Sequence, residues 1–272
     1  MPTTIQIEDP LDSRLDPYRD VRDRDLKGRG DAFMAEGEVV LRLALARAPE
    51  RLQSVLLSRP RFAAMETALA ALPASVPVYV APSPLVEQIA GFPLHRGVLA
   101  LGARPPPSDP AALLRALPRK ALVVGLVGIA NHDNVGGIFR NAAAFGADAV
   151  LIDPATCDPL YRKAIRVSVG ASIVVPFARA ASGDAMIDAL EAEGFSVVAL
   201  TPAARTEIGS LVPAERTGLL LGAEGPGLEP AIIARAKAIR IDMPGGIDSL
   251  NVATSSGIAL HRIATAGGSP MA

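Results

Sequence analysis

The C-terminal part of the chain alternates between short apolar runs and segments of helical periodicity, and this alternation narrows the possible folds most. The apolar runs lie at residues 121–127, 149–152, 173–175, 196–200, 218–221 and 238–241. Helical patterns lie between or after them, at residues 135–145, 160–167, 185–193, 230–237 and 251–263. Continuous apolarity is typical of strands that are buried on both faces of a parallel sheet. The pattern therefore predicts an α/β domain with helices on both faces of a parallel sheet.

A proline-rich segment at residues 104–110, Arg-Pro-Pro-Pro-Ser-Asp-Pro, predicts a linker, because consecutive prolines exclude both helix and central strand. It separates a domain of residues 1–103 from one of residues 111–272. In the first domain we expect strands at 55–57, 76–80 and 97–101. We expect helices at 36–46, 61–72 and 84–90, which makes this a small alternating α/β domain.

The lead segment, residues 1–30, is rich in arginine and aspartate. Its basic residues are interleaved with acidic ones up to Asp31: Arg14, Arg19, Arg22, Arg24, Lys27 and Arg29 alternate with Asp12, Asp16, Asp20, Asp23 and Asp25. Such mixing favours a solvated, salt-bridged helix over a phosphate-binding stripe. The formal net charge of −1 likewise shows no basic excess of the kind that nucleic-acid-binding proteins often carry.

Several classes of protein are disfavoured by composition. The single cysteine, Cys157, rules out an intramolecular disulfide and a cysteine-based zinc cluster, and no His, Asp and Glu cluster has metal-ligand spacing, so no metal is predicted. Neither a secretory leader nor an apolar run long enough for a membrane span is present, so we expect a cytoplasmic protein without a membrane partner.

Three loops that follow predicted strands are candidates for a cofactor site. They begin at Thr201, at Gly222 and at Met243, and cofactors of α/β proteins usually bind at the carboxyl ends of parallel strands. Glycines at 222, 225, 227, 245 and 246 allow backbone groups to approach a ligand closely. The chain contains neither a GxGxxG nor a Walker A sequence, which argues against a dinucleotide or P-loop site.

Three polar motifs contain the candidate functional residues. The first has Asn134, Gly136, Arg140 and then Ala142 to Gly146; the second is Gly222-Ala223-Glu224-Gly225; the third has Ile241, Met243, Gly245, Gly246 and then Ser249 to Val252. Each also has a purely structural explanation. Arg140 could be an exposed helix arginine, Glu224 a surface carboxylate, residues 222–227 a plain turn, and Ser249 with Asn251 a helix N-cap pair.

In this order and spacing, the motifs resemble those of the SpoU/TrmH family of S-adenosylmethionine-dependent RNA 2'-O-ribose methyltransferases. The resemblance implies a SPOUT domain with a deep trefoil knot, joined to a ribosomal-protein-like N-terminal domain that binds rRNA or tRNA. The N-terminal likeness rests on residues 33–37 and 96–98. Two departures are His132, where the family usually has proline, and Ala253-Thr254-Ser255 after the third motif.

The resemblance also implies roles for individual residues. Arg140 would either activate the ribose hydroxyl or grip the substrate phosphate, with Asn134, Glu224, Ser249 and Asn251 completing the catalytic set. The methyl donor would contact residues in the three loops, namely Gly222, Ile241, Leu250, Met243 and Thr201. The alternatives are a non-catalytic RNA-binding protein that retains this fold and a nucleotide-binding metabolic enzyme; the latter is disfavoured because phosphate-binding motifs are absent. The RNA, the nucleotide and any RNA contact by the lead segment stay open.

The family resemblance further implies a homodimer with active sites near the interface. Small or apolar residues dominate the predicted helix at 251–263 and the segment 142–145. We expect that one subunit's sheet cannot cover both surfaces, and that a two-fold dimer buries them. The alternative is that both helices pack inside the monomer.

Overall fold

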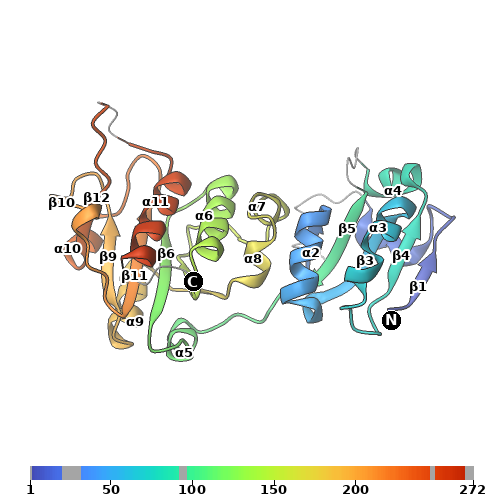
Figure 1. Ribbon diagram of the computed structural model, residues 1–272, viewed down its shortest axis with the longest axis horizontal. Coiled ribbons are helices and arrows are strands. Elements are labelled where there is room, and N and C mark those ends of the chain that lie inside the picture. The colour runs from blue at the N-terminus through green and yellow to red at the C-terminus, as the bar shows by residue number, and fades with distance from the viewer. Residues whose placement is uncertain (1, 20–31, 92–96, 246–248, 267–272) are drawn as a thin grey trace. The chain divides into compact units, whose positions relative to one another are not determined.

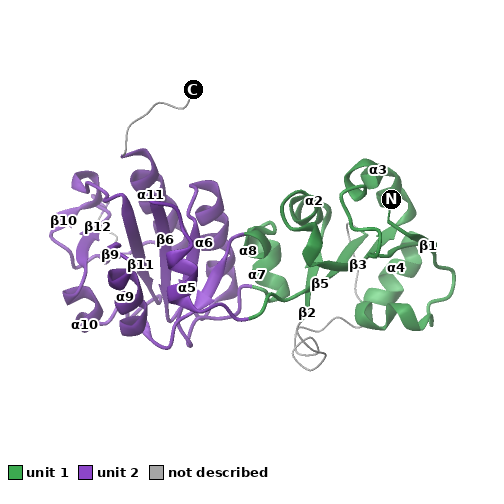
Figure 2. Ribbon diagram, turned by 90° about the horizontal axis from the view of Figure 1, so that it is seen from below, with its two compact units in different colours: residues 1–106, 160–174 green, residues 107–159, 175–272 purple. Residues whose placement is uncertain are grey.

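The computed structural model describes residues 2–19, 32–91, 97–245 and 249–266. Several residues of the sequence analysis lie outside these ranges, among them Gly246, Arg96 and the basic residues at 22, 24, 27 and 29. The chain divides into two compact units (Figure 2). Unit 1 comprises residues 1–106 and 160–174, and unit 2 comprises residues 107–159 and 175–272. The boundary after Pro106 falls inside the predicted linker.

Unit 1 is built on a mixed five-stranded sheet in the order β1-β4-β3-β5-β2. Its strands are β1 (Thr4–Gln6), β2 (Ala32–Glu36), β3 (Leu52–Ser58), β4 (Val78–Ala81) and β5 (Val98–Ala103). β4 is parallel to β1 and β3, whereas β5 is antiparallel to β3 and β2. The helices are α2 (Glu38–Arg47), α3 (Arg59–Leu69) and α4 (Ser83–Ala90). The predicted alternation is confirmed, but the edge strands β1 and β2 were not predicted.

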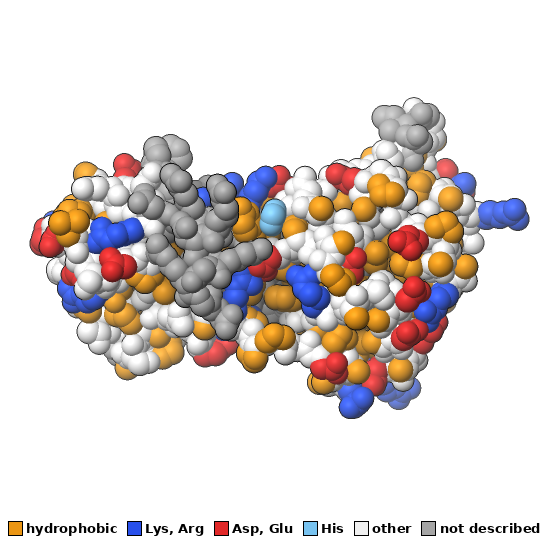
Figure 3. Space-filling model, turned by 180° about the vertical axis from the view of Figure 1, so that it is seen from behind, with side chains coloured by type: hydrophobic (Ala, Val, Ile, Leu, Met, Phe, Trp, Pro, Cys, Tyr) orange, Lys and Arg blue, Asp and Glu red, His pale blue; other side chains and the backbone are white. Residues whose placement is uncertain are grey.

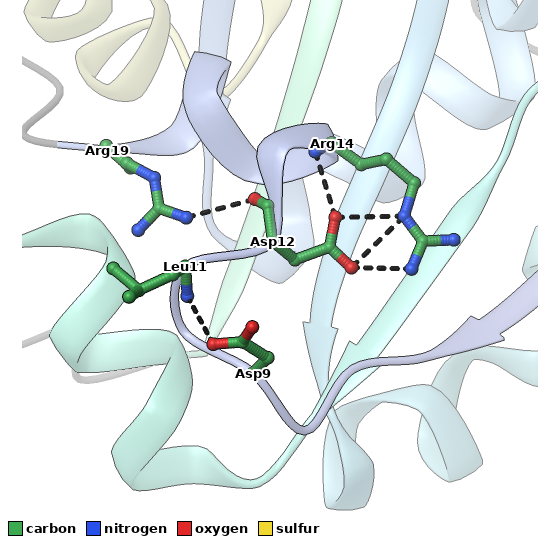
Figure 4. A network of polar contacts seen from close by, with 5 residues as sticks. All are labelled: Asp9, Leu11, Asp12, Arg14 and Arg19. Atoms are coloured by element: carbon green, nitrogen blue, oxygen red, sulfur yellow. Dashed lines mark hydrogen bonds and ion pairs between the residues drawn. The ribbon is translucent and has the colours of Figure 1, made fainter.

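The described end of the lead segment forms a short 3-10 helix, η1 (Ser13–Tyr18), that contains Pro17. Arg14 pairs with Asp12, and Arg19 donates a hydrogen bond to the backbone carbonyl of Asp12 at 3.0 Å (Figure 4). Arg19 also pairs with Asp16 at 3.0 Å. Hydrogen bonds from Arg14 lower the pKa of Asp12 to about 2. The buried Tyr18 hydroxyl lies 2.7 Å from that of Ser54 in β3, which holds η1 on the sheet. The predicted salt bridges are confirmed here, but the helix is shorter and tighter than expected.

Residues 160–174 belong to unit 1 although they lie between two strands of unit 2. They form α7 (Arg162–Val167) and α8 (Ala171–Val174). Arg162 pairs with Glu36 of β2 at 3.1 Å, and Arg51 donates a hydrogen bond to the carbonyl of Ile173. The strand predicted at 173–175 is wrong, because α8 forms there and the strand β8 (Phe177–Arg179) follows. A short apolar run cannot distinguish a strand from a buried helical turn.

Unit 2 contains a seven-stranded sheet in the order β10-β12-β9-β11-β6-β7-β8, and every pairing is parallel. Besides β8, its strands are β6 (Ala121–Val127), β7 (Ala149–Ile152), β9 (Ser196–Leu200), β10 (Thr206–Glu207), β11 (Arg216–Gly222) and β12 (Lys237–Arg240). This confirms the predicted parallel sheet. Because the strands are parallel, their carboxyl ends share one edge, and the loops after β9, β11 and β12 meet there (Figure 1).

Helices cover both faces of this sheet. On one face, α5 (Pro110–Arg115), α9 (Gly183–Ala192) and α10 (Pro230–Ala234) contribute to a single hydrophobic core with the strands. The other two, α6 (His132–Ala144) and α11 (Val252–Thr265), pack against each other (Figure 1). Asp109 caps α5, so the predicted linker extends only to Ser108 before helical structure begins. In the described ranges, no helix has the length and apolarity that a membrane crossing requires.

The packing of α6 on α11 corrects the argument that one subunit leaves these helices uncovered. The small residues of the two helices face each other within one chain. A Cβ atom added at Gly137 would lie 2.7 Å from that of Ala253, and one added at Gly257 would lie 3.2 Å from Nδ2 of Asn141. Ala259, Leu260 and Ile263 are buried, whereas Ile258 is 38% exposed. The glycines therefore permit close packing within the chain rather than marking an open surface.

Candidate methyl-donor site

A cavity of about 330 Å³ lies at the carboxyl edge of the sheet in unit 2. The ends of β9, β11 and β12 form its walls together with the start of α11. All five residues predicted to contact the donor line it, namely Thr201, Gly222, Ile241, Met243 and Leu250. Glu224, Ser249 and Asn251 line it as well. The structure thus brings together residues that are up to 50 positions apart in the sequence.

The loop after β11 is closed tightly on itself. The amide of Gly227 donates to the carbonyl of Ala223 at 3.0 Å, and Gly225 and Gly227 have positive φ angles of 89° and 70°. A Cβ atom at Gly222 would lie 2.4 Å from both the carbonyl carbon of Gly227 and the amide nitrogen of Leu228. Gly222 therefore allows the loop to close on its own backbone, a requirement that the sequence analysis assigned to ligand approach.

The three motifs meet at the side-chain amide of Asn251. Its Nδ2 donates to Oδ1 of Asn134 and to Oε1 of Glu224, both at 2.9 Å. Its Oδ1 accepts hydrogen bonds from the backbone amides at 253 and 254, so Asn251 is also the N-cap of α11. Asn134 is only 5% exposed, and a buried amide of this kind requires a partner. Asn251 therefore joins α6, the β11 loop and α11.

Ser249 and Leu250 differ from Asn251 in that neither of them caps α11. Both are exposed on the cavity side of the chain just before α11. Only Asn251 caps the helix, so half of the predicted N-cap pair is confirmed. Ser249 lines the cavity and does not cap α11.

Arg140 is not part of the cavity lining. It is exposed on α6, and within the described ranges it forms no ion pair or hydrogen bond. It lies six positions after Asn134, so the two side chains point about 120° apart around the helix axis. Glu224 accepts a hydrogen bond from Asn251 and not from Arg140, so this carboxylate orients the amide of Asn251.

Two polar groups that shape the site were not predicted from the sequence. Asn141 lies seven residues after Asn134, on the same face of α6, and bonds to α11; this spacing was the available signal. Asp153 is 7% exposed and accepts hydrogen bonds from the amides of Gly128 and Thr156, at 3.0 and 2.8 Å. It thereby holds the loop between β6 and α6, which leads into Asn134.

The chemistry of the lining suits an uncharged or cationic nucleoside better than a phosphate. Among the described lining residues, Glu224 is the charged one, and Leu200, Leu221, Ile241 and Leu250 supply apolar surface. The described residues contain no group of three side chains able to hold a metal ion. Burial raises the pKa of the Cys157 thiol to about 11, so this thiol is not an activated nucleophile at neutral pH.

Comparison with known proteins assigns the chain to a family. The family model of the SpoU rRNA methylases matches residues 121–261, which contain all three motifs. The chain therefore belongs to the SpoU rRNA methylase family. A protein of Mycobacterium tuberculosis that is described as an uncharacterized tRNA/rRNA methyltransferase is 38% identical over 262 residues, covering 93% of this chain and 89% of its own length.

Other similar proteins have a named activity or a solved structure. The 23S rRNA (guanosine-2'-O-)-methyltransferase RlmB of Coxiella burnetii is 32% identical over 62% of this chain and 69% of its own. The AdoMet-bound rRNA methyltransferase of Sinorhizobium meliloti has a TM-score of 0.77 and 23% identity, over 96% of this chain and 97% of its own. The SpoU methyltransferase AviRb of Streptomyces viridochromogenes also has a TM-score of 0.77, with 21% identity over 94% and 98%. These likenesses establish the fold.

The closed loop after β11 generates a prediction for Gly222. We expect Gly222→Ala to lower the free energy of unfolding by about 1–3 kcal/mol, because the added methyl group meets backbone that cannot give way cheaply. Gly209→Ala is the control, since nothing lies within 4 Å of a Cβ atom there. Chemical denaturation of the two variants measures the difference. Equal stabilities would show that the loop does not depend on Gly222.

Proposed function

We propose that this protein transfers a methyl group from S-adenosylmethionine to a ribose 2'-hydroxyl of rRNA or tRNA. The observation that carries the proposal is the single cavity in which the five predicted donor residues lie beside Glu224, Ser249 and Asn251. Family membership, the named 2'-O-methyltransferase RlmB and the AdoMet-bound Sinorhizobium meliloti structure support it. The lining fits the donor, which is a cation overall and carries no phosphate.

The chain's residues have distinct tasks in this proposal. Bound in the cavity, the donor would supply an electrophilic methyl group on a sulfonium. Apolar side chains such as Ile241 and Leu250 would hold the nucleoside, and the backbone of the Gly222 loop would bind its polar edges. Asn251 and Glu224 would keep the loop and the start of α11 in place, and thereby fix the direction in which the methyl group points. Much of the rate of such an in-line displacement can come from alignment.

Arg140 has a separate task, on the acceptor. Its guanidinium lies in solvent outside the cavity lining, which suits contact with a polyanion. A guanidinium is always protonated, so it is a poor base but an effective bidentate ligand for a phosphate. We therefore propose that Arg140 grips an RNA phosphate and so places the ribose hydroxyl, and that activation of the hydroxyl is the less favoured of the two roles.

The wider assembly is also part of the proposal. We propose that residues 111–272 form the knotted SPOUT domain, that residues 1–103 are an RNA substrate-binding domain, and that the protein works in the cytoplasm as a homodimer. A pooled surface from two copies would help to bind RNA, because each chain has little net charge. On the face shown in Figure 3, acidic and basic side chains are interspersed rather than separated.

The first prediction concerns donor binding and product. Titration calorimetry should show that the purified protein binds S-adenosylmethionine, and nucleoside mass spectrometry should show a 2'-O-methylated nucleoside in RNA incubated with both. RNA from a deletion strain then identifies the modified position. Binding of RNA without binding of the donor would instead support a non-catalytic RNA-binding protein.

The second prediction concerns Arg140. We expect Arg140→Ala to bind the donor normally and to lose roughly 100-fold or more of the methylation rate, because the acceptor is no longer aligned. Arg140→Lys should restore only part of the rate, since an ammonium is a point charge and cannot reproduce a planar fork. An Ala variant that methylates RNA at the wild-type rate would make Arg140 a surface residue without a role.

The third prediction concerns assembly. Sedimentation at micromolar concentration should give a mass about twice that of the 28.1 kDa chain. Ile258→Glu places a charge on a large apolar residue that is exposed on α11, and should weaken the dimer if this part of the helix meets a second copy. A monomer that still methylates RNA would exclude the dimer as a requirement.

A further inference from the structure

Asn141 forms a polar tie between α6 and α11, and α11 contributes to the wall of the cavity. Its Nδ2 donates to the backbone carbonyl of Ala253 at 2.7 Å and to the hydroxyl oxygen of Ser256 at 2.9 Å. Ser256 is fully buried and donates in turn to the same carbonyl at 2.7 Å. The three groups form a closed hydrogen-bonded cluster inside the helix pair. None of them lines the cavity.

The surrounding residues leave room for this cluster and for nothing larger. Gly257 faces the Asn141 amide, and even a single methyl group there would approach Nδ2 to 3.2 Å. Gly137, one turn before Asn141, faces Ala253 with still less space. The helices therefore approach each other through glycines at 137 and 257, and the amide of Asn141 selects one register between them.

The register in which α11 packs on α6 determines the position of the cavity wall that α11 provides. Asn251, Val252 and Ser255 line the cavity from the first turns of α11, and Ala253 and Ser256 are on the neighbouring face of the same turns. A hydrogen bond to Ala253 thus holds the turn that carries the wall. Asn134, two helical turns before Asn141, also holds the start of α11, because it accepts a hydrogen bond from Asn251.

We infer that Asn141 is a positioning residue for the donor site: it holds the first turns of α11 against α6 so that Asn251 and Val252 stand at the cavity wall. This inference rests on the proposed function. It predicts that loss of the tie weakens donor binding in a folded protein, because the wall must be ordered again when the donor binds.

The test uses two substitutions in the full-length protein. Asn141→Ala removes both hydrogen bonds and should weaken S-adenosylmethionine binding about tenfold, as measured by calorimetry. Asn141→Asp keeps the shape but turns a donor into an acceptor that faces the Ala253 carbonyl. Its affinity should be low at pH 8 and should recover as the pH falls, because only the protonated carboxyl can donate. The wild-type protein at each pH is the reference.

Ser182→Ala is the matched control. Ser182 caps α9 through a hydrogen bond to the Ala185 amide at 3.1 Å and does not line the cavity. The Ser182→Ala substitution should destabilise the fold without changing the affinity for S-adenosylmethionine. Equal weakening by Ser182→Ala and Asn141→Ala would overturn the inference, as would unchanged affinity in both Asn141 variants.

Hydrogen exchange separates failure of this inference from failure of the proposed function. Asn141→Ala should speed exchange of the amides of Ser255, Ser256 and Gly257 more than exchange of amides in α9. If the wild-type protein does not bind the donor, the proposed function fails and exchange decides the positioning role. Unchanged exchange at these three amides would overturn it in either case.

Discussion

The donor site depends on one side-chain amide. Asn251 uses its oxygen to begin α11 and its nitrogen to hold Asn134 and Glu224, which lie 117 and 27 positions before it, so three segments converge on a single group. Removing this amide would uncap a helix and leave the buried oxygen of Asn134 without its donor, and each loss costs about 1 kcal/mol or more. An aspartate would retain the cap but repel Glu224. The position thus demands both a donor and an acceptor, which few side chains provide.

The parallel sheet explains why this convergence forms a cavity. Strands β9, β11 and β12 all end at the same edge, and the loops that leave them must turn away before a helix can begin. The closed loop at Gly222 and the capped start of α11 both line the cavity that forms at this edge. In the proposed function, the nearly uncharged lining of the cavity leaves recognition of RNA phosphate to residues outside it, and Arg140 is the residue proposed for this task. The donor and the acceptor would then be recognised by different chemistry on different elements.

Much of this arrangement could be predicted from the sequence, for reasons visible in particular segments. The runs at 121–127, 149–152 and 196–200 matched β6, β7 and β9, because buried parallel strands leave an unbroken apolar signal. The second and third motifs located most of the predicted donor residues by their resemblance to the family, and these residues lie together because loops after parallel strands share an edge. The strand predicted at Ile173 and Val174 was wrong, because β-branched residues in a four-residue helix give the same short apolar pattern as a strand. Strand β2 was missed because its pairing with β5 is antiparallel and long-range, and local sequence does not encode the partner.

The packing of α6 against α11 could not be predicted from composition, because a stripe of Gly and Ala occurs in two different situations. It can be an exposed surface that binds a partner, or a helix–helix contact that is already buried within one chain. The hydrogen bonds of Asn141 decide between them here, since a polar side chain on an open surface would bind water rather than Ala253 and a buried Ser256. Because α6 and α11 pack against each other within one chain, a second copy could contact only their exposed residues, such as Ile258 and the alanines at 143 and 144. The glycines at 137 and 257 thus permit the close approach of α6 and α11 within one chain, and they do not by themselves indicate a dimer interface.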